Sequence, residues 1–183
     1  MVQQNIGLLK SVFKSYNSHS MGGEKAIDRL DQRILELLQA NAREAQVDIA
    51  RSVGLAPSAV LERMRKLEAR GVIRGYSALL DPRAVGIPML AFVAVRSDEV
   101  GGAEDTVAHA LADVPEVLEV HHVAGDDCYL IKVRVRDAEQ LGVLLRTRFG
   151  RIPGVRSTRT TIVLETVKET PRLPIASGEE VVP

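Results

Sequence analysis

Residues 48–70, DIARSVGLAPSAVLERMRKLEAR, contain two short amphipathic helices separated by a tight turn. Ala50 is small enough to let the second helix cross close to the first. Gly54 suits a turn that needs a positive φ, where a Cβ would clash. Val60 stands where the second helix packs back on the first. The combination predicts a helix-turn-helix, whose second helix enters the DNA major groove, with a plain helical hairpin as the alternative.

The outward face of this second helix is basic. Residues 56–75 hold five basic and two acidic side chains, a net charge of +3. With Val60, Met64 and Leu67 inward, a step of ~100° per residue turns the other side chains outward. We expect base contacts near the helix N-terminus and phosphate contacts further along; a solvated charged face is the alternative. The expected base contacts are Ser58, Ala59, Glu62 and Arg63, and the expected phosphate contacts are Arg65, Lys66 and Arg70.

Length and composition limit the possible partners. The 183 residues suffice for one large or two small domains, and an apolar content of 45% can build real cores. The formal net charge is zero, so DNA affinity has to come from the local basic face, present in several copies. Cys128 is the only cysteine, which excludes an internal disulfide and fits a reducing cytoplasm. No apolar run reaches transmembrane length, so no membrane partner is expected.

Turn-forming residues and changes of hydrophobic period divide the chain into five segments. The N-terminal segment is expected to be flexible or loosely helical, and Met21 is an alternative translation start. Three prolines with Ser, Gly and Glu predict a flexible tail at the other end. The expected segments are a flexible extension over 1–25, a helix-turn-helix domain over 26–75, an extended hinge over 76–88, an effector and oligomerisation domain over 89–168, and the tail over 169–183.

The segment 89–168 alternates between strand and helix patterns. Strands are expected at 89–96, 117–123, 128–136 and 155–167, and helices at 103–112 and 137–149. The order β-α-β-β-α-β is the ferredoxin-like arrangement, so the expected fold class is α+β. Its helices cover only one face of the sheet. A second copy of the sheet is the simplest cover for the other face, which predicts a homodimer.

Four sequence stretches, taken together, resemble the Lrp/AsnC (feast/famine) family of bacterial and archaeal transcriptional regulators. LDQRILELLQANAR resembles the first helix of that family, and VGLAPSAVLERMRKLEARGVIRGY resembles its recognition helix and the link beyond. VAGDDCYLIKVRVRD resembles the glycine turn and strand of its effector domain, and GVRSTRTTIVLETVK resembles its last strand. The resemblance covers about residues 27–168.

The resemblance implies a regulator that binds double-stranded DNA as dimers, often assembled to octamers, and responds to an amino acid or related metabolite. It implies a cytoplasmic, nucleoid-associated protein that needs no cofactor besides this small-molecule effector. The effector pocket of the family is lined by the glycine turn, with hydroxyl partners from the last strand. The corresponding residues in this chain are Gly125, Asp126, Asp127, Cys128, Tyr129, Thr158 and Thr160.

The chemistry of that turn suits an amino acid. Backbone N–H groups at a glycine turn can hold a carboxylate, and Asp126 or Asp127 can hold an ammonium group. The family commonly has an acidic residue directly before the residue that matches Tyr129, whereas this chain has Cys128 there. One step along a strand changes the face, so the ammonium partner is displaced or the site takes another ligand or none. A plain hairpin with solvated aspartates is the alternative.

Three functional hypotheses follow. The first is a ligand-responsive transcriptional regulator, and the second is an architectural DNA-wrapping protein that needs no ligand. The third, an enzyme, lacks support because the chain has no P-loop, no Gly-x-Ser-x-Gly and no His-Glu-x-x-His. His121 and His122 point to opposite strand faces and cannot easily share one metal ion, so no metal site is expected. We expect the Cys128 side chain to be buried rather than to act as a redox centre.

Overall fold

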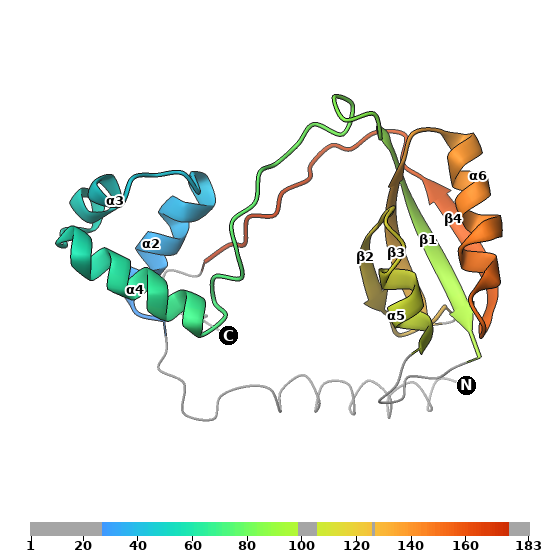
Figure 1. The fold of residues 1–183 in the computed structure, drawn as a ribbon, viewed down its shortest axis with the longest axis horizontal. Helices are drawn as coiled ribbons and strands as arrows, with labels where there is room; N and C mark the ends of the chain where they lie inside the picture. Colours follow the sequence, from blue (N-terminus) through green and yellow to red (C-terminus); the bar gives the residue numbers. More distant parts are fainter. Residues whose placement is uncertain (1–26, 99–105, 126, 176–183) are drawn as a thin grey trace, which may run out of the picture. The chain divides into compact units, whose positions relative to one another are not determined.

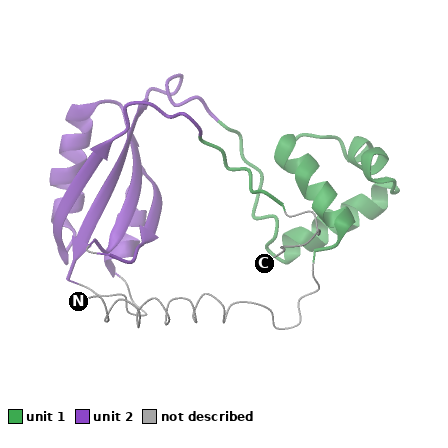
Figure 2. Cartoon of the chain, turned by 180° about the vertical axis from the view of Figure 1, so that it is seen from behind, with its two compact units in different colours: residues 1–79, 169–183 green, residues 80–168 purple. Residues whose placement is uncertain are grey.

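The computed structural model describes residues 27–98, 106–125 and 127–175. It divides into two compact units (Figures 1 and 2). Unit 1 comprises the described residues up to Leu79 together with those from Glu169 onward, and unit 2 is Leu80–Lys168. The extension expected at 1–25, the start of the helix expected at 103–112, and residues 176–183 lie outside the described residues.

The described part of unit 1 contains three helices: α2 (Arg29–Ala40), α3 (Gln46–Val53) and α4 (Pro57–Ala69). Helix α2 begins at its capping residue Asp28, whose carboxylate accepts a 2.8 Å hydrogen bond from the backbone N–H of Asp31. The helices bury one common core of Ile34, Leu38, Ile49, Ala50 and Val60.

The turn between α3 and α4 has the predicted geometry. Gly54 ends α3 in the left-handed conformation, with φ +71°, and the N–H of Leu55 donates to the carbonyl of Ala50 at 3.0 Å. Ala50 and Val60 are both buried. The prediction of a helix-turn-helix from these three positions is therefore confirmed.

Unit 2 follows the predicted order of strands and helices. Its elements are β1 (Met89–Ser97), α5 (Thr106–Ala112), β2 (Val117–His122), β3 (Tyr129–Val135), α6 (Ala138–Thr147), the short 3₁₀ helix η1 (Phe149–Arg151) and β4 (Val155–Ile162). The strands form one antiparallel sheet in the order β2-β3-β1-β4. This is the ferredoxin-like topology, and the α+β class is confirmed.

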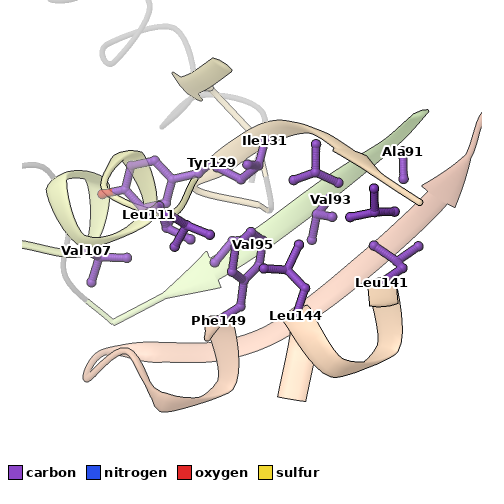
Figure 3. Close-up of a cluster of buried hydrophobic side chains, with 13 residues drawn as sticks. Ala91, Val93, Val95, Val107, Leu111, Tyr129, Ile131, Leu141, Leu144 and Phe149 are labelled. Atoms are coloured by element: carbon purple, nitrogen blue, oxygen red, sulfur yellow. The ribbon is translucent and has the colours of Figure 1, made fainter. Parts of the chain in front are cut away.

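One face of the sheet carries the core of unit 2. Every second residue of β1 and β3 is buried, as the alternation of a half-covered strand requires. Figure 3 shows side chains from both helices meeting those of the strands in a single layer. The buried side chains include Val93 and Val95 from β1, Tyr129 and Ile131 from β3, Val107 and Leu111 from α5, and Leu141, Leu144 and Phe149 from the α6–η1 segment.

The opposite face of the sheet has a mixed surface. Phe92, Ala94 and Leu130 are half-buried there, beside Lys132 and Arg134. The two strands that carry these residues are the central pair of the sheet. This face therefore mixes apolar and basic side chains along its two central strands, and Lys132 pairs directly with Phe92.

Two elements end earlier than the sequence pattern predicts. β4 ends at Ile162 instead of 167. Ile162 pairs with Ala91, and the Val163 N–H still donates to the carbonyl of Leu90. Because β1 begins at Met89, residues 165–167 would lie past its start in this register. Helix α6 ends at Thr147, and the chain tightens into η1 before Pro153. Proline disfavours the helical conformation in the residue before it, so Ile152 is extended and η1 ends at Arg151.

Residues 169–175 also differ from the expectation of a flexible tail. They lie against the end of α2, where Leu173 exchanges two hydrogen bonds with Gln39. Two prolines restrict the conformations available to this segment, and the glutamine amide supplies a peptide-like partner.

No helix among the described residues is long and apolar enough to cross a membrane.

The change Gly54→Ala should destabilise unit 1 by roughly 1–2 kcal/mol, because alanine tolerates a left-handed conformation poorly even though no atom lies within 4 Å of the added Cβ. Urea unfolding followed by circular dichroism measures this. Gly142→Ala, within α6, is the matched control. There alanine favours the helix by up to about 1 kcal/mol, and the nearest atom is the mobile end of Arg146. Equal effects from the two changes would contradict the argument.

Candidate DNA-binding and effector sites

Helix α4 presents the candidate DNA-binding surface. It is fixed to unit 1 by Val60 and Leu67, which are buried. Of the residues expected to contact DNA, Ser58, Glu62, Arg65 and Lys66 are exposed, and Ala59, Arg63 and Arg70 are half-buried. The structure thus brings together on one helix surface most of the side chains that the sequence singled out.

The start of α4 lacks a side-chain cap. Ala56 occupies the N-cap position and makes no side-chain hydrogen bond, and Pro57 is the first helical residue. Proline has no N–H to satisfy at this position and is pre-shaped for a helix start. The positive end of the helix dipole is therefore not neutralised by a capping carboxylate and suits a phosphate group.

Arg63 does not lie as the sequence predicted. Its guanidinium donates to the carboxylates of Asp28 at 2.6 Å and Asp31 at 2.7 Å, both at the start of α2. Its side chain is 29% exposed, and that of Asp31 is 12% exposed. A contact with a base edge would break two charge-assisted hydrogen bonds and leave a shielded carboxylate unpaired. In this structure Arg63 joins the recognition helix to the first helix.

These contacts shift the pKa values of Asp28 and Arg63. The N–H of Asp31 and then the Arg63 guanidinium stabilise the ionised Asp28 carboxylate and lower its pKa below 3.8. The hydrogen bonds to Asp28 and Asp31 raise the pKa of Arg63. Asp28 and Arg63 therefore stay charged at neutral pH, and the contacts of Arg63 hold the start of α2 against α4.

Two further contacts order the rest of α4. Lys66 forms an ion pair with Glu62 one turn earlier, at 3.3 Å, and both side chains remain mostly exposed. At the end of the helix, the Tyr76 hydroxyl donates to Glu68 at 2.9 Å. Burial and then this carboxylate raise the pKa of Tyr76 to about 12. Tyr76 thus ties the segment after the helix to its last turn.

The candidate effector turn contains one close ion pair. Arg159 on β4 donates to Asp127 at 2.6 Å; the Arg159 side chain is 78% exposed and that of Asp127 is 22% exposed. Gly125 has φ +150°, a conformation that other residues rarely adopt. Asp126 lies outside the described residues. Arg159 was not among the predicted site residues, although it stands between two that were.

Cys128 and Tyr129 point into the protein. Tyr129 is fully buried in the helix-covered core, and its ring centroid lies 5.3 Å from that of His122. The Cys128 sulfur packs against the same core, 3.4 Å from the backbone nitrogen and oxygen of Ser97. The Tyr129 side chain is therefore withdrawn from the surface of the turn, and that of Cys128 is only partly exposed.

Thr158 and Thr160 lie on a different face from Arg159. They pair with Val95 and Val93, which face the helices, whereas Arg159 pairs with Ala94 on the opposite face. The expected effector residues therefore do not converge on one surface through their side chains. The ion pair of Asp127 with Arg159 is the polar group that the turn and β4 form together.

His121 and His122, adjacent on β2, contact different partners. Glu119 lies between Lys132 at 3.0 Å and His121 at 3.1 Å, and these neighbours, Lys132 first, lower its pKa. His122 lies beside Tyr129 instead. Across the described ranges, no group of three or more His, Cys, Asp or Glu residues is arranged to hold a metal ion.

Comparison with protein families assigns both parts of the chain. Residues 27–74 match the model described as "Winged helix-turn-helix DNA-binding". Residues 90–173 match the model described as "Lrp/AsnC ligand binding domain". The two matches cover the recognition helix with its partners and the sheet with the candidate effector turn.

Individual relatives agree with this assignment. The HTH-type transcriptional regulator FL11 of Pyrococcus horikoshii is 41% identical over 149 residues, which cover 81% of this chain and 97% of that protein. The leucine-responsive regulatory protein of Escherichia coli K12 is 41% identical over 154 residues, which cover 82% of this chain and 93% of that protein.

Solved structures share the fold. A transcriptional regulator from Neisseria meningitidis, determined as an L-Met complex, has a TM-score of 0.75 and 31% identity over 81% of this chain and 97% of its own. A feast or famine regulatory protein from M. tuberculosis, complexed with L-methionine, has a TM-score of 0.74 and 37% identity over 81% of this chain and 99% of its own.

A helix-turn-helix unit followed by a ferredoxin-like ligand-binding domain defines a class of ligand-responsive, DNA-binding transcriptional regulators. Within that class, the chain belongs to the Lrp/AsnC family. The resemblance noted in the sequence is confirmed, and the relatives named above are regulatory proteins.

Asp28→Asn should reduce the stability of unit 1 at neutral pH by up to about 1 kcal/mol, because the lost ion pair is half-exposed. Asparagine still caps the helix. The pKa of Asp28 is lower in the folded chain than the ordinary 3.8. The wild-type advantage is therefore fully present above pH 3.8 and disappears as the pH falls through the folded-state pKa.

Urea unfolding of both proteins between about pH 2 and pH 6 measures this difference. Arg33→Ala, on the same helix but paired with Glu36, should retain the wild-type pH dependence. A difference between wild type and Asp28→Asn that stays constant over the whole range would contradict the assignment.

Proposed function

We propose that this chain controls transcription by binding promoter DNA in an assembly whose size or DNA occupancy changes when an amino acid, or a closely related metabolite, binds at the turn near Asp127. The observation that carries the proposal is the pair of opposite charges formed by Asp127 and Arg159. Its site of action would be the chromosome, in the cytoplasm.

The ion pair matches both charged groups of an α-amino acid. Asp127 would receive the ammonium group, and Arg159 would receive the carboxylate, a fork that guanidinium groups bind in two-point fashion. Inserting the ligand means breaking the existing pair. That step costs about 1 kcal/mol, since the guanidinium side of the pair is mostly exposed and the ligand ammonium replaces it beside Asp127. The L-Met complexes solved for two structural relatives support this ligand class.

For DNA, we propose that Ser58, Ala59 and Glu62 approach base edges and that Arg65, Lys66 and Arg70 approach phosphates. The exposure of Arg65 and Lys66 supports the phosphate role. Arg63 takes a different role: it orients the recognition helix through Asp28 and Asp31. Its loss would disturb the placement of the whole helix rather than one base contact.

We further propose a homodimer that pairs two recognition helices and assembles further, up to an octamer. The sheet face that carries Phe92, Ala94 and Leu130 supports this, because these apolar side chains are only half-buried within one chain. Effector binding would then shift the balance between assemblies. Such a shift requires different ligand affinity in the different assemblies.

Arg65→Ala should weaken binding to all DNA sequences about equally and lower the slope of log affinity against log salt by about 1. Ser58→Ala should instead change the preference among sequences. Fluorescence anisotropy with the DNA upstream of the chain's own gene, and with a scrambled duplex, measures both. Arg146→Ala, on α6 of unit 2, is the control for loss of one exposed arginine. Equal losses on both duplexes from Ser58→Ala would remove its base-contact role.

Asp127→Ala should abolish any change in DNA affinity or assembly size that an amino acid causes, while DNA binding without amino acid stays within about twofold of wild type. Calorimetry with L-methionine and L-leucine, together with sizing of the DNA complex, measures this. Asp98→Ala is the matched control, because Asp98 pairs with another arginine of β4, Arg156. DNA binding that no amino acid alters would favour the architectural, ligand-independent alternative.

A further inference from the structure

The side-chain amide of Gln39 and the backbone of Leu173 form a two-point contact within unit 1. The Gln39 Nε2 donates to the Leu173 carbonyl at 3.0 Å, and the Leu173 N–H donates to the Gln39 Oε1 at 2.6 Å. A glutamine amide offers one donor side and one acceptor side, as a peptide group does. Gln39 therefore satisfies Leu173 as a neighbouring strand would satisfy it in a sheet.

A second contact joins the neighbouring residue to the same helix. The Arg172 guanidinium donates to the backbone carbonyl of Ala40 at 3.2 Å. Ala40 is the last residue of α2, where carbonyl groups lack helical partners and the helix dipole attracts cations. Two consecutive residues of the C-terminal segment thus dock on two consecutive residues of α2.

These contacts close one side of an open groove of about 760 Å³ in unit 1. The groove lies between α2, residues 72–79 and residues 171–175, and the last two segments run side by side in both views (Figures 1 and 2). Its apolar lining includes Leu35, Leu38, Ile73, Tyr76 and Pro174. Pro171 and Pro174 flank the docked residues and reduce the number of conformations that docking has to exclude.

The position of the docked segment in the chain determines what the contact can do. The chain passes from unit 1 to unit 2 after Leu79 and returns to unit 1 after Lys168, shortly after the end of β4. Unit 2 is therefore joined to unit 1 by two stretches of chain, one of which is held to unit 1 by Gln39 and Ala40. Release of that contact would leave a single effective tether.

We propose that residues 171–175 form a strap: a docked C-terminal segment that is recognised by Gln39 and Ala40 and limits the movement of the helix-turn-helix unit about its tether. A unit held by two tethers loses less freedom when paired units bind two DNA half-sites at once. The strap therefore raises affinity for paired half-sites and leaves affinity for a single half-site nearly unchanged. This last consequence rests on the proposed DNA-binding function, whereas the docking itself does not.

Hydrogen exchange of the full-length protein, read by mass spectrometry, tests the docking without DNA or effector. In wild type, the amide of Leu173 should exchange more slowly than that of an unstructured peptide, because it donates to Gln39. Gln39→Ala should accelerate its exchange by about fivefold or more, the factor expected for one net hydrogen bond. Arg33→Ala, an exposed change on the same helix, should leave it at the wild-type rate. Wild-type exchange at the unstructured rate, or rates unaffected by Gln39→Ala, would overturn the proposal.

The consequence for DNA is tested from the side of the tail. Leu173→Pro removes the backbone N–H that donates to Gln39, whereas Leu173→Ala keeps it. The Leu173 side chain is mostly exposed, so either change removes little packing. On DNA from upstream of the chain's own gene, Leu173→Pro should weaken binding about tenfold. On a duplex with a single half-site, the same change should weaken binding less than about twofold. Leu173→Ala should bind both duplexes nearly as wild type does. Equal losses on both duplexes would refute the tether role. If even wild type fails to bind DNA, the proposed function fails, while the exchange result still decides whether the strap exists.

Discussion

The pairing of β1 with β3 on one side and β4 on the other determines what unit 2 presents to its surroundings. Side chains alternate along β1, so the register that sends Val93 and Val95 to the helices also sends Phe92 and Ala94 to the open face. The same register places Arg159 opposite Ala94, on the side where Asp127 receives it. A shift of the β4 register by one residue would turn the Arg159 guanidinium toward the helices and would turn Thr158 and Thr160 toward the opposite face. The charge pair of Asp127 and Arg159, which we propose as the effector site, is thus a consequence of core packing and not an independent feature.

Most of the fold follows from local patterns in the sequence. Alternation over Tyr129–Val135 and the helical period over α2 and α4 predict these elements to within a few residues, because burial on one face imposes the period. The end of β4 could not be predicted in this way. Residues beyond Ile162 are as rich in β-branched side chains as those before it, but β1 begins at Met89, so residues 165–167 would have no β1 partner in the observed register. The end of a strand depends on a partner more than sixty residues away in sequence.

The residues of the candidate sites, like the elements of the fold, could be predicted from the sequence only in part. The exposed side chains of α4 could be read from the helical period, whereas the role of Arg63 depends on Asp28 and Asp31, which no pattern within the helix reveals. Arg159 carried a signal that was available: strand alternation already separates it from Thr158 and Thr160. Its pairing with Asp127 emerges only once β4 is known to lie beside β1. The prolines near Leu173 indicated a flexible tail on composition, but they also stiffen a segment that has a partner.

The attachment of Arg63 to the start of α2 has a consequence for the redesign of DNA specificity. It divides the recognition helix into a part that orients the helix and a part that faces outward, with Ser58 and Glu62 in the second part. Substitutions in the outward part leave the anchoring ion pairs intact, so new sequence preferences can be selected there with little loss of folding stability. The anchor belongs to the scaffold, and a library of variants with altered specificity should leave it unchanged.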